Sequence, residues 1–333
     1  MILTMRYTTL FLLIFKLSMS FSQEETSILF IGNSFTFMNE MPNTFKEIAL
    51  SKNKKVHVDV VVEGGKNLNY HASQDETYAK IKSRKWDFVV IQGHSNELAQ
   101  PNSKVDRRSL PYAEKIVDSI RSHHGCTEIV LYMTWGYKNG NHLWNPIATY
   151  DSMQLRIKNQ YLRFADILNT RVSPVGAVWK SIRDNYSGIN LYDPDRHHPS
   201  PEGSYVSACT FFATIFGESP VRNSASVSLD DMTRQIIEMN ASQIVLNNLN
   251  QWRCVAKEEL MKINFDLILQ NKSLQAFNRS EGQNEQLWDF GDGFTSSEND
   301  PTHKYGSKGV YQVKLKLRDS CKSIELMREI EVK

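Results

Sequence analysis

The sequence predicts an α/β domain, in which helices cover both faces of a parallel sheet, followed by a small all-β sandwich. Over roughly the first two thirds of the chain, short apolar, β-branched runs alternate with longer amphipathic stretches. This alternation is typical of parallel sheets buried on both faces. From about Lys262 the pattern changes to period-two strands broken by Gly, Asn, Asp and Ser, which indicates strands with one solvated face.

The elements of the α/β domain follow from these patterns in order. The predicted strands are the apolar runs 28–31, 56–62, 88–91, 129–133 and 172–175. The predicted helices lie near 41–51, 110–122, 151–169 and 201–216, and a further amphipathic helix lies near 231–248. Ser200 is the expected N-cap of the helix at 201–216, because Pro201 favours the first helical position.

The composition limits the classes of partner. The 333 residues are 41% hydrophobic, which is enough for two globular domains. Lys and Arg total 39 against 37 Asp and Glu. This near balance gives no electrostatic reason to expect a nucleic acid or an anionic membrane as a partner.

Residues 1–22 have the pattern of a secretory signal peptide. Arg6 precedes the apolar run 10–15, and the small-x-small triplet Ser20-Phe21-Ser22 follows it. The run is too short to span a bilayer. We therefore expect a secreted or periplasmic protein with no membrane span, whose mature chain begins at about Gln23.

The four cysteines are too few for a disulfide scaffold, and none lies in a C-x-x-C pair. Structural zinc is therefore not expected. One disulfide is feasible in an oxidising compartment. Cys254 and Cys321 are the preferred pair, because both lie around the C-terminal domain.

A serine follows the first predicted strand, in Gly32-Asn33-Ser34. Open α/β folds bind ligands at this carboxyl edge of the sheet. A serine hydroxyl is a poor nucleophile unless a histidine accepts its proton and donors stabilise the oxyanion. Serine is also a favoured helix cap, so a catalytic Ser34 requires partners elsewhere in the chain.

Candidate partners lie before the last helix of the α/β domain, where Asp195 and His198 stand in D-x-x-H spacing. In a turn, the Asp195 carboxylate can hold Nδ1 of His198 and leave Nε2 facing the serine. A solvated surface loop is one alternative. A metal site made from Asp193, Asp195, His197 and His198 is another, although no further ligand cluster supports it.

These residues resemble the SGNH, or GDSL-like, hydrolase superfamily. Its Gly-Asp-Ser block reads Gly32-Asn33-Ser34 here, and its Asp-x-x-His block reads Asp195 to His198. The resemblance covers about residues 27–217 and implies a flavodoxin-like parallel sheet. It also implies a catalytic triad of Ser34, Asp195 and His198, with no cofactor or metal. Asn33 replaces an aspartate that is not itself catalytic in the family.

The resemblance implies two middle blocks that supply oxyanion donors. The second predicted strand leads to Gly65, whose backbone amide is the expected donor together with that of Ser34. The third leads to Gln92-Gly93-His94-Ser95-Asn96. This resembles the Gln-Gly-Glu-Ser-Asn block of sialate O-acetylesterase-like members, so either Gln92 or Asn96 is the side-chain donor.

Two further interpretations concern the same edge of the sheet. Ser95 is a rival nucleophile, although its G-x-S-x-G elbow lacks the final glycine and Pro101 interrupts the following helix. Trp135, Tyr137 and Trp144 follow the fourth strand, where they can line the cleft and stack on a sugar ring. Packing on the core is an equally good interpretation of these aromatic residues.

The C-terminal region closely resembles the PKD domain, an immunoglobulin-like sandwich common in extracellular proteins. Its signatures are Trp-Asp-Phe-Gly-Asp-Gly at 288–293, Pro-x-His-x-Tyr at 301–305 and Gly-x-Tyr-x-Val at 309–313. We place the SGNH domain at 23–253 and the PKD-like domain at 254–333. Asp289 and Asp292 are expected to cap backbone amides in a hairpin.

The leading hypothesis is a secreted serine esterase that hydrolyses acyl esters, with acetyl groups on carbohydrate as the expected substrate. The carbohydrate part rests on analogy, from secretion, the PKD resemblance and the sialate-esterase-like block. The alternative is a non-catalytic extracellular glycan-binding or cell-surface protein that retains the SGNH fold. Asn33 and the imperfect oxyanion block favour it, and the three triad residues argue against it.

Overall fold

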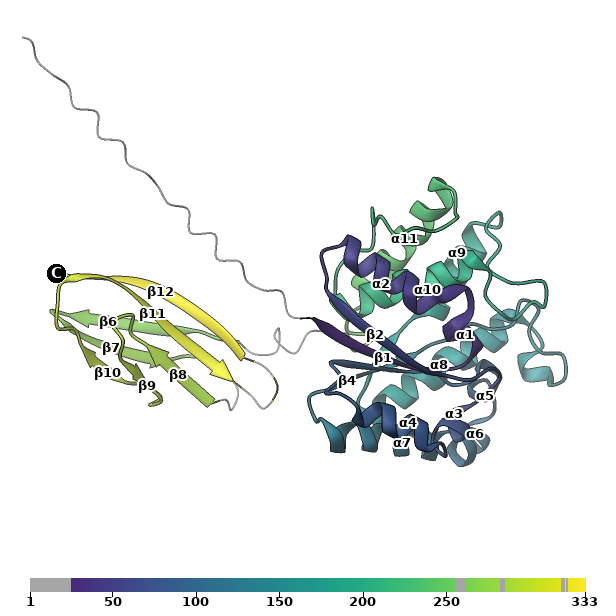
Figure 1. Cartoon of the computed structure of the whole chain (residues 1–333), viewed down its shortest axis with the longest axis horizontal. Coiled ribbons are helices and arrows are strands. Elements are labelled where there is room, and N and C mark those ends of the chain that lie inside the picture. Colours follow the sequence, from purple (N-terminus) through teal and green to yellow (C-terminus); the bar gives the residue numbers. More distant parts are fainter. Residues whose placement is uncertain (1–24, 255–261, 282–284, 319–320, 322) are drawn as a thin grey trace, which may run out of the picture.

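The computed structural model describes residues 25–254, 262–281, 285–318, 321 and 323–333. The expected signal peptide, residues 1–22, lies outside the described residues. An α/β region is followed by a region of antiparallel strands (Figure 1). Within the described residues, no helix combines the length and apolar character needed to cross a membrane.

The sheet of the α/β region consists of five parallel strands in the order β2-β1-β3-β4-β5. The strands are β1 (Thr26–Gly32), β2 (Val56–Val62), β3 (Phe88–Ile91), β4 (Glu128–Tyr132) and β5 (Arg171–Ser173). Each coincides with a predicted strand or is shifted from it by a residue or two, so the fold class is confirmed. Because β1 lies between β2 and β3, its carboxyl end is next to theirs.

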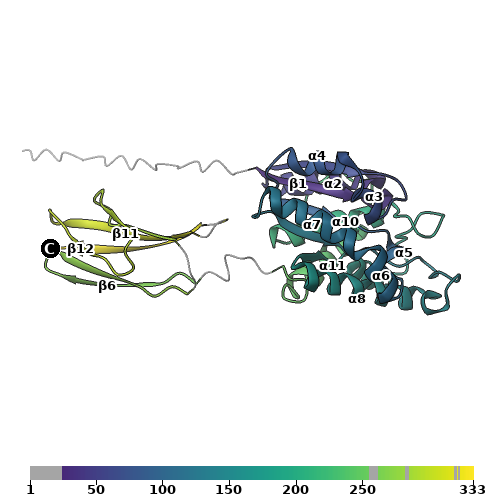
Figure 2. The ribbon, with the colours of Figure 1, turned by 90° about the horizontal axis from the view of Figure 1, so that it is seen from below.

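Helices follow the strands and cover both faces of the sheet (Figures 1 and 2). They are α1 (Ser34–Phe37), η1 (Met38–Glu40), α2 (Met41–Ser51), α3 (Leu68–His71), α4 (Asp75–Lys82), α5 (Ser95–Leu98), α6 (Asn102–Arg108), α7 (Leu110–His123), η2 (Asn145–Ile147), α8 (Tyr150–Leu168), α9 (Val175–Asn185), α10 (Pro201–Phe216) and α11 (Asp231–Leu246). The five helices expected from the sequence correspond to α2, α7, α8, α10 and α11. Ser200 caps α10 as expected, since its Oγ accepts a hydrogen bond from Gly203 N.

Alternate residues of β1 are buried in two separate cores. Ile28 and Phe30 pack with residues of α2, α9, α10 and α11, whereas Leu29 and Ile31 pack with residues of α4, α7 and α8. All four side chains are at most 1% exposed. Both faces of the central strand are therefore closed to solvent, and polar chemistry is confined to the ends of the sheet.

The C-terminal region has two antiparallel sheets, of order β10-β7-β6 and β12-β11-β8-β9. Its strands are β6 (Phe265–Gln270), β7 (Ser273–Asn278), β8 (Glu285–Asp289), β9 (Thr295–Ser296), β10 (Thr302–Lys304), β11 (Gly309–Arg318) and β12 (Ser323–Val332). Phe265, Trp288 and Tyr305 are buried in its core. Asp289 Oδ1 accepts from Gly291 N, and Asp292 Oδ1 accepts from Phe294 N, as expected for hairpin caps.

The predicted disulfide between Cys254 and Cys321 is wrong. Cys321 is bonded to Cys126, with the two Cα atoms 5.1 Å apart. Cys254 is buried in the α/β core beside β5, where its Sγ lies 3.5 Å from Val172 O. Cys126 lies in the loop before β4, at the amino edge of the sheet. The disulfide therefore joins the second domain to the sheet edge opposite the end of β1 that leads to Ser34.

Candidate active site

Gly32 ends β1 at the point where the chain turns into α1. A Cβ atom there would lie 2.5 Å from Thr36 Oγ1 and 2.6 Å from Gln92 Oε1, so a larger residue would displace both side chains. Asn33 then caps α1, its Oδ1 accepting from Phe35 N. Ser34 is the first residue of the helix, so its N–H has no intrahelical acceptor and is available to a substrate.

The segment 191–200 forms a short loop that is closed by a bridge between Tyr192 and Pro199. Within it, Arg196 adopts a left-handed conformation with φ of 70°. This residue makes the sharp turn between Asp195 and His198. The Ser200 N–H donates to Leu191 O at 3.1 Å, which anchors the end of the loop where α10 begins.

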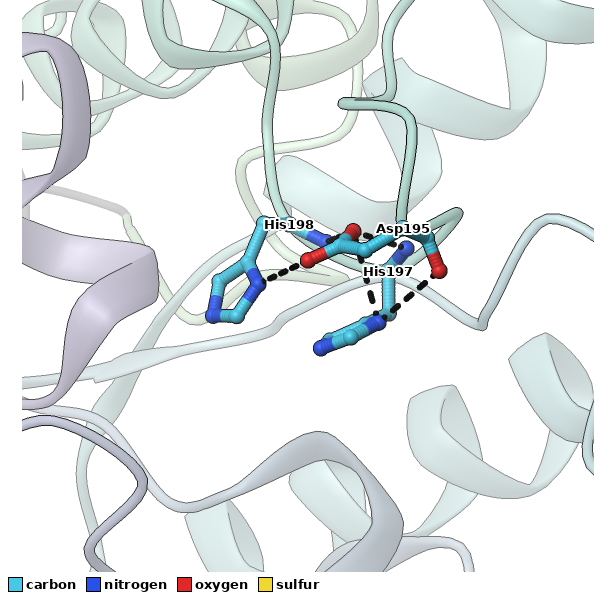
Figure 3. Close-up of side chains that lie close together, drawn as sticks. All are labelled: Asp195, His197 and His198. Atoms are coloured by element: carbon cyan, nitrogen blue, oxygen red, sulfur yellow. Dashed lines mark hydrogen bonds and ion pairs between the residues drawn. The ribbon is translucent and has the colours of Figure 1, made fainter.

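Ser34, His198 and Asp195 form a continuous relay. Ser34 Oγ lies 2.8 Å from His198 Nε2, and His198 Nδ1 lies 2.5 Å from Asp195 Oδ2. Figure 3 shows the Asp195 carboxyl group beside both His197 and His198. A serine hydroxyl can lose its proton to a histidine whose other nitrogen is held by a carboxylate. This geometry can therefore activate Ser34 as a nucleophile.

The hydrogen bonds at Asp195 favour its ionised form. Partial burial raises the pKa of this carboxyl group. The N–H groups of His197 and His198, each 3.0 Å from Oδ1, and the His198 ring outweigh burial and lower the pKa to about 2. The carboxylate is thus charged at neutral pH, as required to orient His198 and stabilise its protonated ring.

Gln92 does not reach the cleft as an oxyanion donor. It is fully buried, and its Nε2 donates to Asn33 Oδ1 at 2.7 Å and Gly93 O at 3.0 Å. Its Oε1 accepts from Asn33 N at 3.0 Å and Thr36 Oγ1 at 2.7 Å. Both ends of the amide are therefore committed to the turn that carries the nucleophile, so the structure places Gln92 in a supporting role.

Asn33 links the nucleophile turn to the loop that contains Gly65. Its Nδ2 donates to Lys66 O at 2.8 Å, while its Oδ1 accepts from Phe35 N and Gln92 Nε2. An ionised aspartate has no hydrogen to donate to Lys66 O. The departure from the Gly-Asp-Ser block therefore has a structural reason, because the amide ties three strand ends together.

Gly65 and Asn96 line a common cavity beside this turn. Gly65 has φ of 68° and no atom within 4 Å of an added Cβ, so it lies in an open, left-handed turn. Asn96 Oδ1 accepts from Gln100 Nε2 at 3.2 Å and Asn141 Nδ2 at 3.3 Å. These two hydrogen bonds hold its carbonyl end and leave Nδ2 available as a donor.

The expectation that Trp135 binds substrate is wrong. Trp135 is fully buried, stacked between Phe35 at 4.6 Å and Trp179 at 3.8 Å. Its Nε1 donates to His197 O at 3.0 Å, so it supports the loop of Asp195 and His198 from below. Burial of the large apolar indole ring is favourable, so Trp135 packs in the core although it follows a strand end.

The other two aromatic residues are partly exposed. Tyr137 lies beside His197, with ring centroids 5.4 Å apart, and Trp144 faces Arg156, whose guanidinium carbon is 4.8 Å from the ring centroid. Tyr137 is thus next to the relay, whereas Trp144 is held by an intramolecular cation–π contact. The side chain of Ser95, the rival nucleophile, lies outside the described part of the structure.

Of the four residues considered as metal ligands from the sequence, three lie close together in the structure. Asp195, His197 and His198 have ligand atoms within 4.8 Å of one another, and Asp193 is not among this group. In the described residues, His198 Nδ1 and Asp195 Oδ2 already bind each other. A metal ion here would need to break the contact that orients His198 towards Ser34.

Two features of the site had no sequence signal. Asn39 donates from Nδ2 to Pro199 O at 2.9 Å and thereby fixes the loop next to His198. It adopts a left-handed φ of 51°, an uncommon conformation for a residue other than glycine. His94 lies in the cleft, where burial lowers its pKa, with smaller contributions from His197 and His198. Both residues reach the site only through folding.

Comparison with known proteins identifies the C-terminal domain. The PKD domain family model matches residues 268–332. The solved PKD1 domain of the Vibrio cholerae metalloprotease PrtV is 34% identical over 22% of this chain and 95% of its own, with a TM-score of 0.21. The chain also shares 62% identity over 34 residues with the microbial collagenase of Vibrio alginolyticus, and these residues span 10% of this chain and 4% of the collagenase.

The α/β domain is similar to solved structures of low sequence identity. A DUF4886 family protein from Bacteroides uniformis is 20% identical over 67% of this chain and 95% of its own, with a TM-score of 0.59. A Slackia heliotrinireducens protein described as an SGNH hydrolase is 26% identical over 58% of this chain and 100% of its own, with a TM-score of 0.48. Residues 268–332 therefore belong to the PKD family, and the preceding domain shares its fold with the DUF4886 family protein.

Proposed function

We propose that this protein is a secreted serine esterase that removes acyl groups, with acetyl groups on carbohydrate as its substrate class. The observation that carries the proposal is the relay from Ser34 through His198 to Asp195, with contacts of 2.8 and 2.5 Å. It lies at the carboxyl end of β1, where open α/β folds place their ligands. The SGNH-like fold is consistent with this chemistry but does not define the substrate.

In the proposed reaction, Ser34 Oγ attacks the ester carbonyl carbon while its proton passes to His198 Nε2. The carbonyl oxygen becomes an oxyanion, for which the N–H groups of Ser34 and Gly65 and Asn96 Nδ2 are the proposed donors. The alcohol leaves with the proton from His198. Water then attacks the acyl-Ser34 ester, returns a proton through His198 and releases the carboxylic acid.

The carbohydrate assignment is supported by the PKD domain, a type of module common in extracellular proteins, and by Tyr137. This residue is partly exposed beside His197, close to where the leaving alcohol would depart. Aromatic rings provide apolar faces on which sugar rings can stack. Secretion is proposed from the N-terminal pattern of residues 1–22.

Hydrolysis of 4-nitrophenyl acetate by the wild type and by Ser34→Ala tests the proposal. We expect turnover by the wild type and a loss of about 10³-fold or more in the variant, because removing a triad member leaves only oxyanion and binding effects. A fluorophosphonate probe should label the wild type at Ser34 alone. Absence of both turnover and labelling in folded protein would favour the non-catalytic glycan-binding alternative.

Release of acetate from O-acetylated xylo-oligosaccharides tests the carbohydrate part separately. We expect release at a higher kcat/KM than for 4-nitrophenyl acetate, because binding of the sugar contributes to transition-state stabilisation. Hydrolysis of 4-nitrophenyl acetate without release of acetate from any acetylated sugar would support the esterase activity and reject carbohydrate as its substrate.

A further inference from the structure

A cavity of about 350 Å³ adjoins the proposed oxyanion donors. Gly65 and Asn96 form one part of its lining, and Lys104 and Arg108 of α6 form another. Ser34 and His198 are not among the lining residues. The cavity therefore extends from the proposed oxyanion donors toward a pair of cationic side chains, and its volume exceeds what the methyl group of an acetyl ester needs.

No described residue forms an ion pair with Lys104 or Arg108. Arg108 is exposed and forms no ion pair or hydrogen bond through its side chain with any residue in the described part of the chain. Lys104 Nζ donates one hydrogen bond, to the uncharged Gln100 Oε1 at 2.9 Å. Since an ammonium group has three donors, Lys104 retains donors for a ligand.

The other titratable groups of the lining do not cancel this charge. Glu97 is directed into the protein, where its Oε2 accepts from His94 N at 3.2 Å and Leu68 N at 3.4 Å. Burial raises the pKa of Glu97 and lowers that of His94, so both groups shift toward their neutral forms. His94 Nδ1 accepts from Asn96 N at 3.3 Å, which requires an unprotonated nitrogen.

We propose that this cavity binds a carboxylate carried by the ester substrate, with Lys104 and Arg108 as the residues that recognise it. The proposal rests on the esterase function proposed above and narrows its substrate class. Arginine and lysine bind carboxylates through charge-assisted hydrogen bonds. The carboxylate belongs either to the sugar, as in an acetylated hexuronate, or to the acyl group, as in a dicarboxylic acid half-ester, in which case the acyl group is not acetyl.

Two matched substrate pairs distinguish these sources. For the acyl side, the pair is the 4-nitrophenyl half-ester of succinate and 4-nitrophenyl pentanoate, which is similar in length and uncharged. For the sugar side, the pair is acetylated methyl glucuronide and acetylated methyl glucoside, with acetate release as the readout. The measured quantity is the ratio of kcat/KM for the anionic member to that for the neutral member of each pair.

We expect one of the two ratios to favour the anionic substrate by about tenfold or more in the wild type, as charge-assisted hydrogen bonds allow. The double variant Lys104→Gln/Arg108→Gln should remove most of that preference. Arg107→Gln is the matched control, because Arg107 has the same charge and is adjacent on α6 but does not line the cavity. This control should retain the preference.

The proposal is overturned if neither pair shows a preference, if the preference survives in the double variant, or if Arg107→Gln lowers it equally. Should no ester be hydrolysed at all, the esterase function fails, and the cavity is then tested by binding alone. Calorimetric titration of Ser34→Ala with succinate and glucuronate should show binding of one of them, weakened about tenfold in the added double substitution. Absence of binding rejects the cavity proposal independently of turnover.

Discussion

Two of the Asp–His contacts among the described residues have similar distances and very different surroundings. In the α/β domain, Asp195 Oδ2 lies 2.5 Å from His198 Nδ1, and the second ring nitrogen faces Ser34 Oγ. In the PKD domain, Asp292 Oδ2 lies 2.7 Å from His303 Nε2. The His303 ring stacks on Phe290 at 4.3 Å and meets Tyr305 edge-on. The first pair can serve chemistry, whereas the second holds a hairpin against its core.

The difference shows that a carboxylate–imidazole pair is not in itself a catalytic feature. What distinguishes Asp195 and His198 is a third group, a hydroxyl at the end of a parallel strand, and a nearby cavity. The pair in the PKD domain has aromatic rings on the faces where a substrate would need to approach. Function therefore depends on the neighbours of the pair.

The largest effect on turnover is expected when the carboxylate of the first pair, Asp195, loses its charge, and the same change in the second pair is the control. Asp195→Asn should lower turnover of 4-nitrophenyl acetate by about 10³- to 10⁴-fold, because His198 loses the acceptor that fixes its tautomer. Asp292→Asn is the matched control and should leave turnover unchanged while lowering the melting temperature of the PKD domain. Steady-state kinetics and calorimetry measure the two effects. Equal turnover in both variants would remove the catalytic role of Asp195.

The next effect concerns Asn96, the proposed side-chain donor to the oxyanion. Asn96→Ala should lower kcat by about 100- to 1000-fold, as the loss of one oxyanion donor does, with an unchanged circular dichroism spectrum. Asn139→Ala, an exposed asparagine outside the cavity, is the control. If Asn96→Ala retains near wild-type kcat, the side-chain donor is absent from the site as described.

A smaller effect is expected from restoring the usual aspartate of the family block. Asn33→Asp removes the donor to Lys66 O and should lower kcat by about 10- to 100-fold at neutral pH, since a buried acceptor loses its partner. A protonated carboxyl group can donate, so the ratio of variant to wild-type kcat should rise as the pH falls toward about 4. A ratio that is constant with pH would show that the hydrogen bond to Lys66 O has no role in turnover.

The lowered pKa of Asp195 predicts a pH dependence of stability. The pKa of Asp195 in the folded protein, about 2, is below the usual 3.8. The ionised carboxylate therefore stabilises the folded state fully above about pH 4, and this stabilisation is lost as the pH falls through about 2. The difference in melting temperature between the wild type and Asp195→Asn should therefore shrink from pH 5 to pH 2. An equal difference in melting temperature at pH 5 and pH 2 would contradict the hydrogen bonds assigned to the Asp195 carboxylate.

The smallest effect on turnover is expected at the disulfide. Cys126→Ser should leave hydrolysis of 4-nitrophenyl acetate within about twofold of wild type, because Cys126 lies at the sheet edge opposite to Ser34 and a disulfide acts mainly by restricting the chain. Small-angle X-ray scattering should show a larger radius of gyration in the variant. Loss of turnover in folded Cys126→Ser would show that the PKD domain contributes to the site.

Local sequence determined the elements and the chemistry-bearing motifs of this protein. The β-branched runs at 56–62 and 88–91 coincide with β2 and β3. Burial on both faces requires the near-continuous hydrophobic residues of β3, whereas β2 is a partly buried edge strand that also carries His57 and Asp59. The three signatures at 288–293, 301–305 and 309–313 predicted a PKD domain, and the family model over residues 268–332 confirms it. These features depend on residues close together in the chain, so their spacing alone carries the information.

Tertiary structure decided how distant segments meet. Ser34 and His198 are 164 residues apart in the chain, and sequence supplied their identities but not their distance. It could not show that the Gln92 amide is occupied by hydrogen bonds to Asn33. Nor could it show that Trp135 is buried or that Cys126 bonds Cys321. Each of these depends on which surfaces pack together, and that is settled by the competition for burial and hydrogen bonds across the whole fold.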